Sequence, residues 1–325
     1  MTATLVPFAG YWWVYVAFTA VILVLLALDL GVFHRKAHHP SFREASVWIG
    51  IWILLALLFC FGLYQYTGFQ FGEARARQVA LEFLTGYVVE ESLSLDNMFV
   101  FVLIFSYFRI PAQFHHRVLF YGILGALFFR SIFIALGSTL FQFEWVVILF
   151  GIFLILTGLK MMLSGEQQID PDKNWLIRLV RKFVPVTSEF NGQRLFTRVA
   201  GKLHGTPLLL ALAAIETADI IFAVDSVPAI FGITKEPFIV YTSNVFAILG
   251  LRSMYFLLSG AMLRFHLLRY GLAVLLIFVG LKMSWLNALW NGHFPTGIAL
   301  AVIGGVLAAS IALSLLIPPP AKKTT

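Results

Sequence analysis

Two long apolar stretches of this sequence carry carboxylates at depths where a membrane-spanning helix normally has none. The acids are Glu90 and Asp96 in the first stretch and Glu216, Asp219 and Asp225 in the second. A carboxylate in the middle of a bilayer costs about 2.5 kcal/mol or more, so such residues usually mark an ion path. The pattern occurs twice, which a single chance charge does not explain. The sequence therefore predicts an ion site built from both stretches.

The composition is that of a helical membrane protein. Of 325 residues, 60% are hydrophobic and 12% are charged, whereas about a quarter of a soluble protein is charged. The apolar runs are about twenty residues long, which is the length of a membrane-spanning helix and about twice that of a barrel strand. We expect one all-α transmembrane domain over residues 1–325. Its nine spans lie near 11–33, 46–64, 79–106, 117–139, 145–163, 207–232, 238–262, 270–288 and 296–317.

Positive charges gather in alternate loops. Sixteen of the 23 lysines and arginines fall on one side of the expected spans, in segments 34–46, 107–117, 164–206, 264–269 and the C-terminal tail. The opposite loops hold only Arg75, Arg77 and Lys235. The positive-inside rule then places the N-terminus outside and the C-terminus in the cytoplasm. Loop placement also explains the net charge of +7 without a nucleic-acid partner.

The longest loop, residues 164–206, is basic. Residues 175–183 combine apolar and basic side chains at helical spacing, which indicates an amphipathic helix on the cytoplasmic membrane surface. A binding site for a regulatory partner is the alternative. Cys60 is the only cysteine, so the chain has no intrachain disulfide. Because no glycine-rich phosphate loop or nucleophile–base set is present, we do not expect an enzyme.

An internal repeat relates spans 3–5 to spans 6–8. Leu95-Asp96-Asn97 matches Val224-Asp225-Ser226, and a second acid, Glu90 or Asp219, lies six residues before each aspartate. Two further matches follow in the same order: Ile123-Leu124-Gly125 with Arg130-Ser131 matches Ile248-Leu249-Gly250 with Arg252-Ser253, and Gly158-Leu159-Lys160-Met161 matches Gly280-Leu281-Lys282-Met283. Three spans per unit reverse the orientation of the second unit. The sequence thus predicts a 3+3 inverted repeat, a transporter plan with its site near the midplane.

This repeat divides the chain. We expect peripheral spans in 11–78, the first repeat in 79–163, the cytoplasmic basic loop in 164–206, the second repeat in 207–288 and a peripheral span in 296–317.

The acids and their neighbours supply only oxygen ligands. Ser94, Asn97 and Ser226 add neutral oxygens beside the carboxylates, and such ligands suit Mg²⁺, Ca²⁺ or Mn²⁺ rather than softer metals. On a regular helix, acids six residues apart point about 120° from each other. Either they serve two positions along a path, or the helices are broken. Pro228 favours a break, because its ring frees the carbonyl of Val224.

Four buried bases can neutralise the acids. Arg130, Arg252, Lys160 and Lys282 lie in the same spans, and buried charges are usually paired. A purely structural pairing is therefore the alternative for any single acid. A mixed arrangement, in which the bases balance the acids when no cation is bound, also allows proton exchange on the carboxylates. We treat proton coupling as a hypothesis.

The motifs resemble the TerC family, most closely its alkaline-inducible branch, called Alx. The matching stretches are Glu82–Tyr87, Leu95–Val100, Phe105–Phe108, Phe222–Phe231 and Thr242–Arg252. The resemblance implies a bacterial inner-membrane protein of the LysE-like transporter superfamily that exports manganese(II) and needs no organic cofactor. It also implies that Glu90, Asp96, Glu216, Asp219 and Asp225 are the functional acids. Two alternatives remain: an accessory protein that loads metal onto exported enzymes beside the secretion machinery, and a calcium/proton exchanger.

Overall fold

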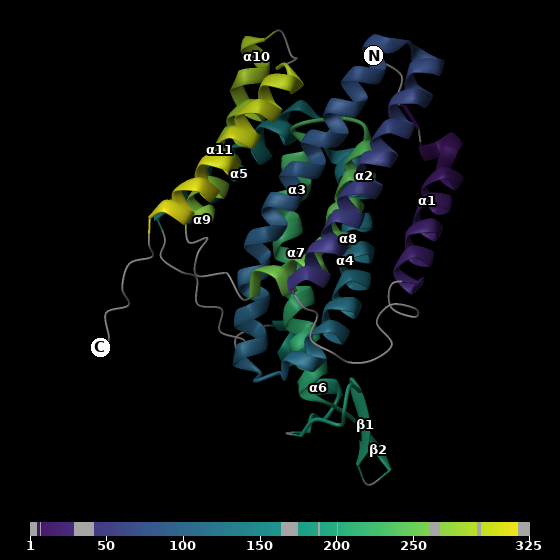
Figure 1. The fold of residues 1–325 in the computed structure, drawn as a ribbon, viewed down its shortest axis with the longest axis vertical. Coiled ribbons are helices and arrows are strands. Elements are labelled where there is room, and N and C mark those ends of the chain that lie inside the picture. The colour runs from purple at the N-terminus through teal and green to yellow at the C-terminus, as the bar shows by residue number, and fades with distance from the viewer. Residues whose placement is uncertain are drawn as a thin grey trace.

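A computed structural model describes residues 5–6, 8–28, 42–163, 175–187, 189–199, 201–259, 267–290 and 294–317. This part of the chain is helical except for connecting loops and one short hairpin (Figure 1). The elements are α1 (Phe8–Leu28), α2 (Phe42–Phe71), α3 (Glu73–Tyr107), α4 (Ala112–Leu140), α5 (Glu144–Leu163), α6 (Trp175–Phe183), β1 (Phe196–Val199), β2 (Lys202–Gly205), α7 (Pro207–Phe231), α8 (Pro237–Ser259), α9 (Leu268–Leu281), the π-helical turn η4 (Lys282–Leu286), α10 (Asn287–Leu289) and α11 (Thr296–Leu316).

Within the described residues, seven helical segments are long and apolar enough to cross a membrane. They are α1, α2, α4, α5, α7, the continuous segment Leu268–Leu289 and α11. The chain is thus a polytopic helical membrane protein. Helices α3 and α8 coincide with two further expected spans but fall outside this set. Helix α3 is the longest, with 35 residues, and its acidic side chains lower its mean hydropathy.

The first helices extend further than the apolar runs predict. Helix α2 continues to Phe71 and α3 begins at Glu73, whereas the expected spans end at residue 64 and begin at residue 79. Gly72 alone separates the two helices and has a φ of 88°, a left-handed conformation that favours glycine. Polar residues that lengthen a helix beyond the bilayer carry no hydropathy signal, so the apolar pattern misses them.

Helices α3, α4, α7 and α8 form the centre of the molecule. Helix α3 packs on α8, α4 packs on α7, and α2 covers α3 and α8. In α7, 56% of the apolar window is buried, against 11% in α1, so α7 is a core helix and α1 lies at the periphery (Figure 1). Helices α5, α9 and α11 form the flank on the other side of the centre (Figure 1).

Small residues allow α5 and α9 to approach closely. A Cβ atom at Gly151 would lie 2.9 Å from the backbone oxygen of Gly280, and one at Gly158 would lie 2.7 Å from that of Ala273. Both separations are shorter than ordinary van der Waals contact. Glycine at these positions is therefore what permits the crossing.

Helix α6 and the hairpin project from one end of the bundle, which we call the hairpin end (Figure 1). Helix α6 has the bounds that the amphipathic pattern predicts, and its Ile177 is buried while α6 packs on α7. Strands β1 and β2 pair antiparallel, with Arg198 opposite Leu203. The sequence gives no prediction of this hairpin, because four-residue strands are too short for a clear alternation.

Candidate cation site

A single buried arginine lies between acids from two helices. Arg130 of α4 is 1% exposed, and its guanidinium forms ion pairs with Glu90 of α3 and Asp219 of α7. Its Nη2 donates to Asp219 Oδ1 at 3.0 Å, its Nε donates to Asp219 Oδ2 at 3.4 Å, and its Nη1 donates to Glu90 Oε1. The two acids are almost fully buried as well. Buried charges of this kind are stable only when paired and hydrogen-bonded.

Asn244 of α8 completes the arrangement. Its side-chain oxygen accepts a hydrogen bond from Arg130 Nη1 at 2.9 Å, and its nitrogen donates to Glu90 Oε2 at 3.1 Å. Ser94 Oγ lies 3.4 Å from Glu90 Oε1 and donates to it. The site therefore joins α3, α4, α7 and α8 through side chains. Sequence reasoning missed Asn244, although a fully buried asparagine inside an apolar span is a signal that could have identified it.

The expected break in α7 is wrong. Helix α7 runs from Pro207 to Phe231 as one helix, with Pro228 inside it. A proline removes one backbone hydrogen bond, and here the neighbouring bonds and the packing hold the helix together. Regular helical geometry then directs Asp219 and Asp225 to different sides of α7. Asp219 binds Arg130, whereas Asp225 is half-buried and interacts electrostatically with Lys160 of α5. Two positions along a path remain the prediction for acids six residues apart.

The predicted neutral ligands lie on the same two helices. Ser94 and Asn97 of α3 and Ser226 of α7 are buried. The hydroxyl oxygen of Ser226 has no hydrogen-bond partner among the described residues. The side chain of Asp96, one of the five predicted functional acids, lies outside what the structure describes.

Two further glutamates each keep one buried carboxylate oxygen without a partner in the described part of the chain. These are Glu91 Oε2 and Glu216 Oε2. Each lies against a glycine of the neighbouring helix: a Cβ at Gly125 would overlap the Glu216 carboxylate, and one at Gly250 would lie 3.4 Å from Glu91 Oε1. The glycines of the matched Ile-Leu-Gly segments thus make room for these two acids. Glu91 is not among the five acids that the family resemblance implies.

The four predicted bases occupy different surroundings. Arg130 bridges two acids, whereas Arg252 lies 3.2 Å from His116 Nε2 through its Nη1. Lys282 is buried and donates to the backbone oxygen of Gly232 at 2.8 Å. Lys160 is exposed on α5, so the prediction that all four bases are buried is wrong for this residue.

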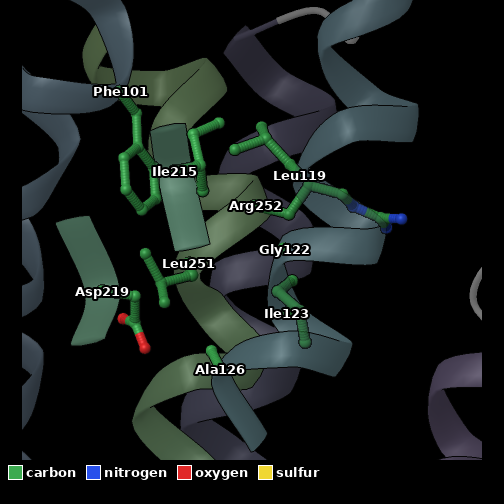
Figure 2. Close-up of a pocket in the computed structure, with 9 residues that line it drawn as sticks. All are labelled: Phe101, Leu119, Gly122, Ile123, Ala126, Ile215, Asp219, Leu251 and Arg252. Carbon is green, nitrogen blue, oxygen red and sulfur yellow. The ribbon is translucent and has the colours of Figure 1, made fainter. Parts of the chain in front are cut away.

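A small cavity borders the site (Figure 2). Its α4 residues precede Arg130 in the sequence, on the part of α4 nearer the hairpin end. Its volume is about 10 Å³, enough for about one water molecule. Asp219 and Arg252 are its charged lining residues, and the others are Phe101, Leu119, Gly122, Ile123, Ala126, Ile215 and Leu251. Figure 2 shows the guanidinium of Arg252 extending away from Asp219.

The described side chains do not form a ready-made metal cage. Among them, no three histidine, cysteine, aspartate or glutamate residues lie together in an arrangement that could hold a metal ion. The positive group between Glu90 and Asp219 is the arginine itself. The arrangement can therefore hold one buried cation, and a metal ion would have to take the place of the guanidinium.

Comparison with known proteins agrees with this architecture. The family model described as "Integral membrane protein TerC family" matches residues 76–322. The membrane protein STKORF319 of Myxococcus xanthus is 48% identical over 95% of this chain and 94% of its own length. The Escherichia coli K12 protein named "Putative membrane-bound redox modulator Alx" is 45% identical over 89% of this chain and 90% of its own. No solved structure matches. This chain belongs to the TerC family of integral membrane proteins.

Proposed function

We propose that this protein is a secondary transporter that exports manganese(II) across the bacterial inner membrane. The observation that carries the proposal is the bridge from Arg130 to Glu90 and Asp219 at the centre of the bundle. Two carboxylates that hold a cationic side chain can hold a metal ion instead once that side chain moves away. Ionisable groups at this depth are costly and are usually kept for ion transport.

The choice of cargo rests on ligand chemistry and on the family. Carboxylate, hydroxyl and amide oxygens suit a hard divalent cation. The resemblance to the Alx branch then favours manganese within that class. In this account Glu90 and Asp219 form one cation position, and Asp96 and Asp225 with Asn97 and Ser226 form a neighbouring one. Glu216 completes the path.

Alternating access follows from the proposed inverted repeat, and helix packing supports it. In the repeat, α3, α4 and α5 of the first unit correspond to α7, α8 and α9 of the second. The α3–α8 contact therefore corresponds to the α7–α4 contact, and both contacts are extensive. In the same way, the Gly151–Gly280 approach of α5 and α9 corresponds to the Ala273–Gly158 approach. In this topology α3 and α8 are the two remaining spans of nine. We place the N-terminus outside and the hairpin end in the cytoplasm, and we assign the protein to the LysE-like transporter superfamily.

Proton coupling is part of the proposal. Glu91 and Glu216 each have a buried carboxylate oxygen without a partner among the described residues, and an ionised carboxylate in that position is expensive. Protons are therefore expected to bind these groups when the cation leaves and to be released when it returns. Manganese flux into vesicles should then respond to an imposed pH gradient, and a flux that ignores the gradient excludes coupling.

Other functions predict different results. A calcium/proton exchanger would show calcium outcompeting manganese in a flux assay. An accessory protein that loads metal onto exported enzymes would still bind such an enzyme when flux is abolished by Asp219→Asn. The redox role in the name of the Escherichia coli relative would have to operate without an intrachain thiol pair, since this chain has one cysteine.

Cellular manganese tests the proposal in the living cell. Expression of the wild-type protein should lower the manganese content of bacteria grown with added manganese, measured by mass spectrometry. Asp96→Asn and Asp219→Asn should abolish the effect, whereas Glu73→Gln, which alters an exposed acid at the start of α3, should not. Equal manganese in cells with and without the wild-type protein would reject manganese export.

A further inference from the structure

The two repeats contain one shared acid pair and two arginines that could bind it. Glu90 and Asp219 occupy matching positions, six residues before Asp96 and Asp225. Arg130 and Arg252 also match, since each begins an Arg-Ser pair that precedes a Gly-Leu-Lys-Met segment by the same distance. An exchange of the two units therefore keeps the acid pair and replaces Arg130 by Arg252.

The structure places these arginines differently. Arg130 lies between the two acids, whereas Arg252 lines the cavity that also reaches Asp219. In Figure 2 the Arg252 side chain extends away from that acid, and its Nη1 lies 3.2 Å from His116 Nε2. The arginine of one repeat is thus in the site while the arginine of the other stands beside it.

The helix packing is not the same on the two sides of Arg130 along the bundle. On the side away from the hairpin, a Cβ at Gly86 of α3 would lie 2.9 Å from Ser243 Oγ of α8, so these helices are in direct contact. The residue that matches Gly86 in α7 is Ile215, counted from Asp96 and Asp225. Ile215 lines the cavity. On the hairpin side α4 and α7 are also in contact, since a Cβ at Gly122 would lie 3.2 Å from Ile215 Cγ2, but a cavity of about 10 Å³ lies beside them.

Charge prevents Arg130 and Arg252 from binding the Glu90–Asp219 pair at the same time. Glu90 and Asp219 together balance the charge of one arginine and leave one negative charge, while a second guanidinium in the same buried space would add like-charge repulsion and desolvation. We propose that Arg130 and Arg252 are alternate counter-ions of the Glu90–Asp219 pair, Arg130 in the state with the cavity at the hairpin end and Arg252 in the state that opens at the opposite end. The inference rests on the proposed alternating-access function and adds the residues that distinguish its two states.

Asn244 makes the state with Arg130 in the site differ in stability from the state with Arg252 in the site. Asn244 bonds both Arg130 and Glu90, and its match in α4, counted from the Arg-Ser pairs, is Gly122. Gly122 has no side chain to bond Arg252, and it lines the cavity. The state with Arg130 in the site is therefore the more stable one without cargo.

Cysteine labelling reads the two states directly. In a Cys60→Ser background, Ala126→Cys reports the cavity, and Ser243→Cys reports the packed side. Labelling rates with a small thiol reagent are measured on purified protein in detergent with a chelator, so that both ends face water and no metal is present. Arg252→Gln should speed labelling of Ala126→Cys and slow that of Ser243→Cys. Arg130→Gln should do the reverse.

The expected changes are about tenfold or more, since loss of one buried ion pair shifts a two-state balance by at least that factor. Asn244→Ala is a second test in case the Arg130→Gln variant misfolds. It weakens the state with Arg130 in the site without removing a charge. It should therefore change both labelling rates in the same direction as Arg130→Gln. Equal rates in all variants, or shifts in the same direction for both arginines, would overturn the exchange. Manganese flux is not used, so absent flux with reciprocal labelling would reject the transport proposal and keep this one.

Discussion

Replacement of Arg130 by glutamine should destabilise the protein strongly in the absence of metal. The substitution removes the positive partner of two buried acids, and removal of one partner from a buried ion pair costs about 3–5 kcal/mol. Four hydrogen bonds from this guanidinium to three side chains are lost. Because Arg252 can take the place of Arg130 beside these acids, we use the lower value of about 3 kcal/mol. At about 2 °C per kcal/mol, that value corresponds to a melting midpoint roughly 6 °C lower.

The assay is thermal unfolding of purified protein in detergent, with chelator and then with added Mn²⁺. Arg77→Gln is the matched control, since it removes an arginine–glutamate pair whose side chains are 70% and 67% exposed. Water and salt screen such surface pairs, so they contribute little to stability. Manganese should raise the midpoint of the Arg130→Gln variant more than that of the wild type, because the cation no longer competes with the guanidinium. If Arg130→Gln has the same melting midpoint as Arg77→Gln, both in chelator and in manganese, then the buried pairs of Arg130 contribute no more than a surface pair.

Three further predictions use the same unfolding assay. Gly125→Ala should lower the free energy of unfolding by about 1–3 kcal/mol, because its Cβ would overlap the Glu216 carboxylate. The control Gly304→Ala, where the added atom meets nothing within 4 Å, should leave the stability unchanged. Equal losses of stability in the two variants would contradict this packing. Gly158→Val should separate α5 from α9 and cost at least as much as Gly125→Ala, so an unchanged midpoint would exclude the close crossing. Burial, offset in part by the amide of Leu5 and by Arg75, raises the pKa of Glu236 in the α7–α8 loop. Its contribution to stability is therefore present below the ordinary glutamate pKa of about 4.3 and is lost as the pH rises through the raised value. The melting midpoint of the wild type relative to that of Glu236→Gln should decrease as the pH rises from about 4.3 through the raised pKa, and an increase would contradict the sign.

Hydropathy predicted the helical class because each apolar run has the length of a membrane crossing. It could not predict that α2 and α3 meet at Gly72, since the polar turns on either side carry no apolar signal. Nor could it separate core helices from peripheral ones. Helix α7 is largely buried and α1 is not, yet both are apolar, because lipid and protein interior select the same side chains.

The acids were identifiable from sequence because charge is rare at membrane depth, but their partners were not. Four bases were available, and only the fold decides that Arg130 reaches Glu90 and Asp219. Pro228 suggested a broken helix, and the packing of α7 prevents one. Asn244 was identifiable as a polar residue inside an apolar span, but its partners depend on α8 lying against α3 and α4.

Transport by this protein requires Glu90 and Asp219 to hold the transported cation in place of Arg130. The most direct test is the initial rate of Mn²⁺ uptake by proteoliposomes that contain the wild-type protein, Glu90→Gln, Asp219→Asn or the Glu73→Gln control. We predict that each buried substitution lowers the rate by about tenfold or more, a loss of about 1.4 kcal/mol in binding energy or greater, while the control transports like the wild type. Wild-type rates in both Glu90→Gln and Asp219→Asn would contradict the account.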